Sequence, residues 1–413
     1  MKSSWGVREK KRRYIEVWIF FLMLFSVNFF ELIPITRVIG PNGAFTFCLL
    51  TLFFCFTFNR EAWIRDSKDW LKPFWWFLAG VFLSFLPALI YYGQSPVQSF
   101  FTYRRMFQFA AFPIFIAIRP SERELRTALY AFSIVYLASA LFVTFSAPDW
   151  VELSENVQLV EEGDYVHSLE GIRILSLAFI FAFAKLVREY SFKNLAWAVF
   201  LFGILYLIQN RTSLLAVIFI AAYAVFSMKA SARKLVIISV VAVTLLLMFV
   251  YTAGQWGHLY QKTVEQILNP DYNRNKALTY MFAHRPWLRY LFGDGFISAN
   301  VSDIIPVLQE QGIYFSDVGL IGTWFQFGVI TVGTVVVMVV KAFSRKKTFL
   351  VKACAIYLLA GTFTMSYFAL GESLLWLSLY LYIFYSDGLP SFAERTTRKR
   401  FTGWSTQSFR SIS

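Results

Sequence analysis

Long apolar runs recur along the whole chain, and they restrict its fold more than any other feature of the sequence. A helix that crosses a membrane needs roughly 20 predominantly apolar residues. Backbone polar groups inside hydrocarbon must be hydrogen-bonded within the segment, which favours helices. We therefore predict an all-α polytopic membrane protein, a single integral membrane domain over residues 1–413, with about twelve spans at 15–33, 40–58, 73–92, 106–118, 127–146, 172–187, 195–209, 212–228, 235–253, 317–340, 349–369 and 372–386. The fourth span is short, and we expect it to begin earlier, near Thr102.

The composition agrees with lipid as the main solvent. Hydrophobic residues make up 57% of the chain, aromatic residues 20%, and there are 47 Phe. The three cysteines, Cys48, Cys55 and Cys354, all fall within apolar runs, so we expect no disulfide framework. The basic start of the chain leads into a long apolar run with no small-residue cleavage site, which indicates an uncleaved anchor.

Basic residues are distributed by side of the predicted membrane. Of the 39 Lys and Arg, 29 lie in the termini and in the connections on the same side as the termini. Cytoplasmic loops carry an excess of Lys and Arg, so both termini are predicted to be cytoplasmic, with residues 387–413 as a basic cytoplasmic tail. The net charge of +14 is explained by this distribution, and we expect no nucleic-acid partner.

Two sizeable loops are predicted on the outer face. Residues 147–171 form an acidic loop. Residues 254–316 form the largest soluble segment, and its many aromatic residues distinguish it from a low-complexity tether. Helical pieces at about 258–268 and 275–283 would lay aromatic faces on the membrane surface. Membrane lipid is therefore an expected partner.

Arg211 occupies an unusual position between two apolar runs, 195–208 and 214–226. The residues from 195 to 228 barely suffice for two crossings and a turn, so Arg211 is predicted at a hairpin tip that hardly clears the bilayer. An arginine deep in lipid costs roughly 2.5 to 3.5 kcal/mol, so such residues usually face a cavity and an anionic partner. The alternative is an arginine whose side chain extends to the lipid headgroups.

Further arginines are predicted on the same outer face. Guanidinium groups match phosphate oxygens in a bidentate way and stay charged in a partly dry site. Several of them aimed at one cavity would form a pyrophosphate clamp, and the candidates besides Arg211 are Arg104, Arg105, Arg173, Arg274, Arg285 and Arg289. For Arg104, Arg105 and Arg173 the alternative is simple anchoring of helix ends to headgroups.

Asp317 is the first candidate for a catalytic base, because it lies at the membrane entrance of the tenth predicted span. A half-desolvated carboxylate can have a raised pKa and accept a proton from a sugar hydroxyl. The alternative is that Ser316 or Asp317 caps the helix. His284 is a second candidate, or else a solvated loop residue. The sequence has no phosphate-binding loop, HExxH pattern or Cys/His cluster, so we expect no cofactor and no metal site.

Several short motifs together resemble the bacterial O-antigen polymerase and O-antigen ligase superfamily. The resemblance covers roughly residues 195–340 and rests on these segments: Asn210-Arg-Thr212, Asn273-Arg274, His284-Arg-Pro-Trp287, Gly293-Asp-Gly295 and Gly319-x-x-Gly322. In the ligases a histidine and an Asn-like residue precede the Gly-x-x-Gly segment, whereas Ser316 and Asp317 stand here. The resemblance therefore implies a polymerase more than a ligase.

This resemblance implies a glycosyltransferase in the bacterial cytoplasmic membrane. Its donor would be a polyprenyl-pyrophosphate-linked oligosaccharide, without nucleotide sugar or recognised metal. Arg211 and Arg274 correspond to the family's arginines at the hairpin and at the start of the large-loop helix. A flippase and a chain-length regulator of the same pathway would be partners. Alternatives are a ligase-type transferase, a flippase or other secondary transporter, and a scaffold for other synthesis enzymes. The single large outer loop argues against the two similar halves typical of transporters.

Overall fold

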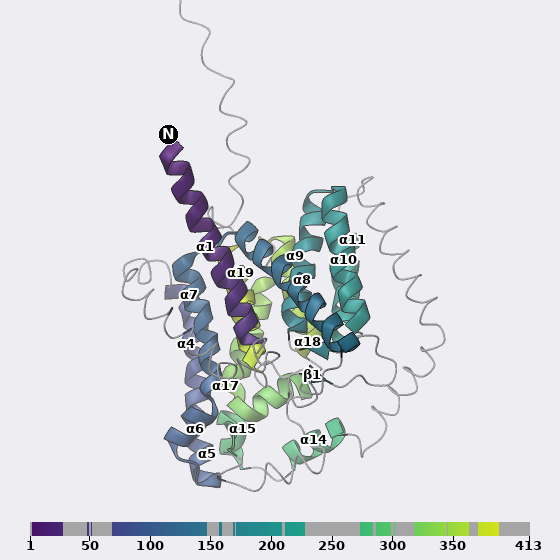
Figure 1. Cartoon of the computed structure of the whole chain (residues 1–413). Coiled ribbons are helices and arrows are strands. Elements are labelled where there is room, and N and C mark those ends of the chain that lie inside the picture. Colours follow the sequence, from purple (N-terminus) through teal and green to yellow (C-terminus); the bar gives the residue numbers. More distant parts are fainter. Residues whose placement is uncertain are drawn as a thin grey trace, which may run out of the picture.

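The computed structural model describes the chain as a bundle of α-helices (Figure 1). The residues that it describes are 2–27, 48, 51, 68–146, 157–158, 168–169, 171–208, 211–227, 273–283, 286–298, 301, 318–344, 346–362 and 371–387. Within them the predicted all-α class is confirmed, apart from the two-residue strands β1 (Val157–Gln158) and β2 (Ser168–Leu169), which pair antiparallel. Among the described residues, three helical segments are long and apolar enough to cross a membrane, namely Lys72–Tyr92, Glu122–Phe145 and Gly319–Ala342.

Most of the described helices overlap a predicted apolar run, but α1 does not match its run closely: it begins at Lys2 and ends at Ser26, whereas the first span is predicted at 15–33. The described helices are α1 (Lys2–Ser26), α4 (Lys68–Leu83), α5 (Phe85–Tyr92), α6 (Pro96–Thr102), the 3-10 helix η3 (Arg104–Ala110), α7 (Ala111–Ile118), α8 (Glu122–Ser146), α9 (Ile172–Arg188), α10 (Phe192–Ile208), α11 (Arg211–Ser227), α14 (Asn273–Phe282), α15 (Trp287–Phe292), α17 (Gly319–Ala342), α18 (Phe349–Thr362) and α19 (Gly371–Ser386). The predicted spans 172–187 and 372–386 coincide with α9 and α19 almost to the residue. The second and ninth spans, 40–58 and 235–253, lie outside the described residues except for two positions.

Most of the predicted loops also lie outside the described residues. The acidic loop 147–171 is described only at the two short strands and at Gly171. Of the large loop 254–316 the structure describes 273–283, 286–298 and residue 301, and the basic tail is described only at Asp387. The helical piece expected at 275–283 is present as α14.

The fourth predicted span, expected to begin near Thr102, is not one continuous helix, because α6 ends at Thr102 and the span is divided between η3 and α7. A capping box starts α6, because Ser95 Oγ accepts from Gln98 N at 3.2 Å and Gln98 Oε1 accepts from Ser95 N at 2.9 Å. Pro96 occupies the first helical position, where a missing N–H costs little. The chain then changes course at Tyr103 and continues through η3 into α7. This part of the bundle is therefore a succession of short helices.

The central helix of the bundle is α19. Every residue from 374 to 386 is buried, including the large side chains of Trp376, Tyr380 and Tyr382. Around it pack η3, α7, α1 and α9. The peripheral helices expose large apolar side chains instead, such as Phe192 at 84% and Phe226 at 86% of their surface. An apolar exterior around a buried helix is the pattern expected when hydrocarbon surrounds the bundle.

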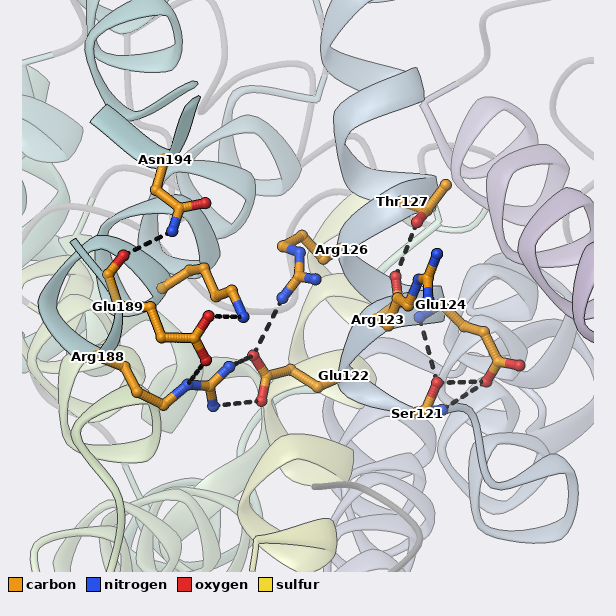
Figure 2. A network of polar contacts seen from close by, with 10 residues as sticks. Ser121, Glu122, Arg123, Glu124, Arg126, Thr127, Arg188, Glu189 and Asn194 are labelled. Carbon is orange, nitrogen blue, oxygen red and sulfur yellow. Dashed lines mark hydrogen bonds and ion pairs between the residues drawn. The ribbon is translucent and has the colours of Figure 1, made fainter. Parts of the chain in front are cut away.

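One end of the bundle is closed by ion pairs between the start of α8 and the end of α9 (Figure 2). The Arg188 guanidinium donates two hydrogen bonds of 2.8 Å to the Glu122 carboxylate, and Arg126 adds a third at 3.3 Å. Tyr382 OH donates to the carbonyl oxygen of Pro120 at 2.7 Å, which brings the end of α19 to the same place. We refer to this side of the molecule as the Glu122 end.

The short helices α14 and α15 lie far from the start of α1, at the opposite end of the bundle (Figure 1). There the turn between α5 and α6 is joined to the segment after α15. Gln94 Nε2 donates to the carbonyl oxygen of Phe296 at 2.8 Å, and Gln94 Oε1 accepts from Ser298 N at 2.7 Å. We refer to this side as the α15 end. Which end faces the cytoplasm stays a prediction from the basic residues.

Candidate functional site

A buried chain of hydroxyl groups joins α9 and α11 near their N-terminal ends. Ser176 Oγ on α9 donates to Ser213 Oγ on α11 at 3.0 Å, and Ser213 Oγ lies 3.1 Å from Tyr357 OH on α18. The two serines are fully buried and the tyrosine nearly so. Buried polar groups in an apolar bundle are costly unless they are hydrogen-bonded. This chain therefore fixes how α9, α11 and α18 sit relative to one another.

The same contact brings together two of the predicted phosphate-binding positions. Arg173 precedes Ser176 by one turn on α9, and Arg211 is the first residue of α11, just before Ser213. The Arg173 side chain is buried, with 8% of its surface exposed. The side chain of Arg211 lies outside the described residues. Two arginines that are far apart in the sequence thus belong to neighbouring helix starts.

The electrostatics of these helix starts favour an anion. The N-terminus of a helix carries a partial positive charge, so anions are stabilised there and cations are not. Neither α9 nor α11 has an acidic residue in its first turn. Each has an arginine there instead, which adds to the positive potential. The arrangement is suited to a ligand with several negatively charged oxygens.

A second group of candidate residues surrounds a break in α17. Gly328 has φ of +73° and ψ of −177°, which is incompatible with a continuous helix. A helix that stops leaves carbonyl oxygens of its last turn without helical donors. Here the carbonyl oxygen of Phe325 accepts from Asp294 N at 2.9 Å, and that of Gln326 accepts from Gly295 N at 2.7 Å. The turn after α15 therefore satisfies the broken end of the first half of α17.

The close contact between the segment after α15 and the break in α17 requires a glycine in each segment, Gly293 in the first and Gly328 in the second. Gly293 has φ of +76°, and a Cβ atom there would lie 2.3 Å from the carbonyl oxygen of Gln326. Both the left-handed backbone and the close approach exclude a side chain at this position. Trp324 on α17 also donates its indole N–H to the carbonyl oxygen of Tyr290 at 2.8 Å. The segment from α15 to Gly295 thus lies tightly along α17.

Arg289 on α15 is held by an acidic and two aromatic partners. Its Nε and Nη2 donate to the two carboxylate oxygens of Asp294 at 2.6 and 2.7 Å, and Nη2 also donates to Tyr92 OH. Its guanidinium carbon lies 5.4 and 5.3 Å from the ring centroids of Tyr91 and Tyr92 on α5. Burial alone would lower the pKa of Arg289, but hydrogen bonding to Asp294 and its negative charge outweigh burial and raise the pKa.

Gln94 and Tyr103 complete the attachment of this segment to the rest of the bundle. The Gln94 side chain is fully buried and also donates to Ser99 Oγ at 2.8 Å. The ring of Tyr103 packs against those of Phe296 and Phe327, with centroid distances of 4.5 and 4.9 Å, and the two phenylalanine rings also contact each other at 5.8 Å. Residues 289–298 are consequently tied to α5, α6, η3 and α17 at once.

The helix α14 packs against the first turns of α17. Ala277 and Met281 on α14 form a small apolar cluster with Val318 and Phe325. A small pocket opens beside this contact and is lined by Met281, Phe282, Arg289, Tyr290, Ile321, Trp324 and Phe325. Arg274 lies in the first turn of α14, one turn before Ala277, and its side chain is outside the described residues.

The predicted site residues therefore fall into two groups and a remainder. Arg173 and Arg211 share one pair of helix starts, while Arg274 and Arg289 lie on α14 and α15 beside the first half of α17. Arg104 opens η3 with an exposed side chain, and its Nη1 lies 3.5 Å from the carbonyl oxygen of Phe101. The remaining candidates lie outside the described residues: Asp317, His284, Arg285 and the side chain of Arg105.

The sequence did not single out several residues on which these groups depend. They are Tyr92, Gln94, Ser176, Ser213, Gly328 and Tyr357. The serines and Gly328 are isolated small residues in apolar runs, where small residues usually serve close helix packing. Among the described residues, no group of three or more His, Cys, Asp or Glu is placed to hold a metal ion.

The fold and these groups define a helical protein with candidate membrane-spanning helices and a positively charged pair of helix starts. No protein-family model matches the chain, and no curated protein matches it either.

Proposed function

We propose that this protein is a metal-independent glycosyltransferase that polymerises a cell-envelope polysaccharide in the bacterial cytoplasmic membrane, with both termini in the cytoplasm. Its donor is a polyprenyl-pyrophosphate-linked glycan, and its acceptor is another lipid-linked repeat unit on the outer face. The product would be a capsule, an exopolysaccharide or an O-antigen.

The observation that carries this proposal is that Arg173 and Arg211 lie in the first turns of α9 and α11, two helices joined near their N-terminal ends by the Ser176–Ser213 hydrogen bond. Guanidinium groups bind phosphate oxygens with fixed geometry, and two helix N-termini reinforce them. A pyrophosphate offers oxygens for both arginines. The resemblance of the Asn210-Arg-Thr212 and Asn273-Arg274 segments to the O-antigen polymerase superfamily supports the same ligand.

The proposed reaction is a single glycosyl transfer. An acceptor hydroxyl oxygen attacks the anomeric carbon of the donor, and the bond from that carbon to the pyrophosphate oxygen breaks. Asp317, or alternatively His284, takes the hydroxyl proton. The departing pyrophosphate keeps the electron pair, and Arg173, Arg211 and Arg274 stabilise the charge that grows on it. Such preorganised stabilisation is usually the largest contribution to catalysis.

A secondary transporter is the second candidate, and the break in α17 is the observation in its favour. Transporters commonly bind their substrates at discontinuous helices whose freed backbone groups face the ligand. In this chain the carbonyl oxygens of Phe325 and Gln326 at the break already accept hydrogen bonds from the turn after α15. They therefore have less capacity to coordinate a transported ion, and the polymerase is favoured.

Deletion of the gene followed by mass analysis of lipid-linked intermediates tests the proposal. A polymerase defect leaves single lipid-linked repeats on the outer leaflet. A flippase defect leaves them on the inner leaflet. A ligase defect leaves long polymers attached to the carrier lipid, and either of these last two results would overturn the proposal.

A further inference from the structure

Arg289 was expected to bind pyrophosphate, but its surroundings fit a different role. Two of its nitrogen atoms are engaged by the Asp294 carboxylate, and one of them also by Tyr92 OH. The Asp294 side chain has 1% of its surface exposed, so this negative charge stays next to the guanidinium. An approaching anion would meet a neutralised pair rather than an open cation.

The pair connects segments that are distant in the sequence. Tyr92 ends α5, Arg289 belongs to α15, and Asp294 lies in the turn that follows α15. The backbone of the same turn donates to the carbonyl oxygens of Phe325 and Gln326, just before the break in α17. Arg289 and Asp294 therefore join α5 to the broken end of the first half of α17.

The break separates two parts of α17 with different supports. The part after Gly328 packs along α4. The part before it, residues 319–327, is held by α15 through the Trp324–Tyr290 hydrogen bond and by the turn after α15. Since a non-helical residue divides the two parts, the orientation of the first is set by these contacts and not by helix continuity.

The first part of α17 in turn supports α14. Ala277 and Met281 pack on Val318 and Phe325, and Phe282 meets Trp324 with a ring-centroid distance of 6.2 Å. A displacement of residues 319–327 would therefore move α14, whose first turn includes Arg274.

From this chain of contacts we infer that Arg289, Asp294 and Tyr92 form a positioning cluster, which fixes residues 319–327 of α17 and the α14 helix that carries Arg274. Arg289 is then a positioning residue and makes no contact with the pyrophosphate. The inference rests on the proposed function for its catalytic consequence, whereas the structural coupling within the cluster stands independently of it.

A double-mutant cycle tests the coupling. The variants are Arg289→Leu, Asp294→Leu and their combination, with Arg123→Leu as a control because Arg123 is an exposed arginine at the Glu122 end. Thermal unfolding midpoints of the purified proteins are compared in detergent micelles. Each single change leaves a poorly exposed charge without its partner, so the double variant should recover at least about half of the midpoint lost by Arg289→Leu. Additive losses would overturn the coupling, and the control should not shift the midpoint.

Kinetics separate positioning from phosphate binding. The substrate is the set of lipid-linked repeats extracted from the deletion strain, and each variant is assayed in proteoliposomes. The assay temperature lies below the unfolding midpoint of every variant, and the rates are normalised to the amount of folded protein. Positioning predicts that Arg289→Leu and Asp294→Leu both lower kcat on the order of ten- to a hundredfold with KM nearly unchanged. Arg289→Lys should not restore kcat, since an ammonium group cannot reproduce the bidentate pairing. A raised KM in Arg289 variants alone, or an unchanged kcat, would overturn the positioning role.

Failure of the proposed function gives a different result. If the deletion strain accumulates no single repeats, the protein is not the polymerase. The double-mutant cycle measured by thermal unfolding would still show whether Arg289 and Asp294 are coupled.

Discussion

Gly328 on α17 and Leu291 on α15 approach so closely that a Cβ atom on the glycine would lie 2.1 Å from the leucine carbonyl oxygen. The contact is made backbone to backbone, with φ of +73° at Gly328. Left-handed backbone of this kind is readily adopted only by glycine. One residue therefore both breaks a long apolar helix and admits the segment that satisfies the break.

Gly328→Ala should destabilise the protein by about 2 to 4 kcal/mol, because the substitution adds a clash to an unfavourable backbone conformation. Gly333→Ala, in the same helix, is the matched control, since a Cβ atom there meets nothing within 4 Å. In the control, alanine should be neutral or stabilising by up to about 1 kcal/mol. Unfolding midpoints in detergent measure both, and equal shifts would show that the close contact is absent.

Arg211→Ala and Arg173→Ala should each leave the protein inserted in the membrane and end chain growth. Removing one electrostatic donor from a preorganised site commonly costs on the order of a hundred- to a thousandfold in rate. Arg211→Lys should recover little, because lysine lacks the planar fork. Polymer length in the complemented deletion strain is the measurement, and membrane immunoblots check expression.

Arg123→Ala is the control for the pyrophosphate clamp of Arg173 and Arg211. Arg123 is exposed at the Glu122 end, far from the first turns of α9 and α11. The Arg123→Ala variant should leave polymer length unchanged. Normal polymer in Arg211→Ala cells would remove the clamp from the mechanism.

The hydroxyl chain between α9, α11 and α18 should be measurably stabilising. Tyr357→Phe keeps the ring stacked against Tyr380, with centroids 6.1 Å apart, and removes only the hydroxyl group facing Ser213. We expect a loss of about 1 kcal/mol, the usual net value of one hydrogen bond. The double variant Tyr357→Phe/Ser213→Ala should lose less free energy of unfolding than the two single variants lose together, because the two residues share the interaction. Strict additivity in unfolding experiments would argue against this contact.

The predicted orientation of the two ends can be tested with single cysteines. Gln98 is exposed at the α15 end, and Arg123 is exposed at the Glu122 end. In a variant whose three natural cysteines are replaced, Gln98→Cys should react with a membrane-impermeant maleimide in intact cells. Arg123→Cys should react only after permeabilisation, because Lys and Arg concentrate on the cytoplasmic side. The opposite labelling pattern would show that the predicted orientation is wrong and that the α15 end faces the cytoplasm.

Much of the helix placement could be predicted from the sequence. The predicted spans at 172–187 and 372–386 match α9 and α19 closely, since a long apolar run leaves the backbone few alternatives in lipid. Arg104, Arg173 and Arg211 could be proposed in the same way, because a cation beside an apolar run is conspicuous, whereas Arg289 is proposed from its place in the large outer loop. Their partners could not, as the case of Arg289 shows.

By itself, the sequence determined the helical class, the approximate bounds of α9, α10, α11 and α19, and a set of candidate cationic residues. Only the tertiary structure decided that Arg173 and Arg211 open neighbouring helices, that Arg289 is paired with Asp294 and Tyr92, and that α17 breaks at Gly328. The physical reason is that hydropathy acts locally along the chain. A hydrogen bond such as that between Tyr92 and Asp294 joins residues 202 positions apart, and it exists only once the helices have packed.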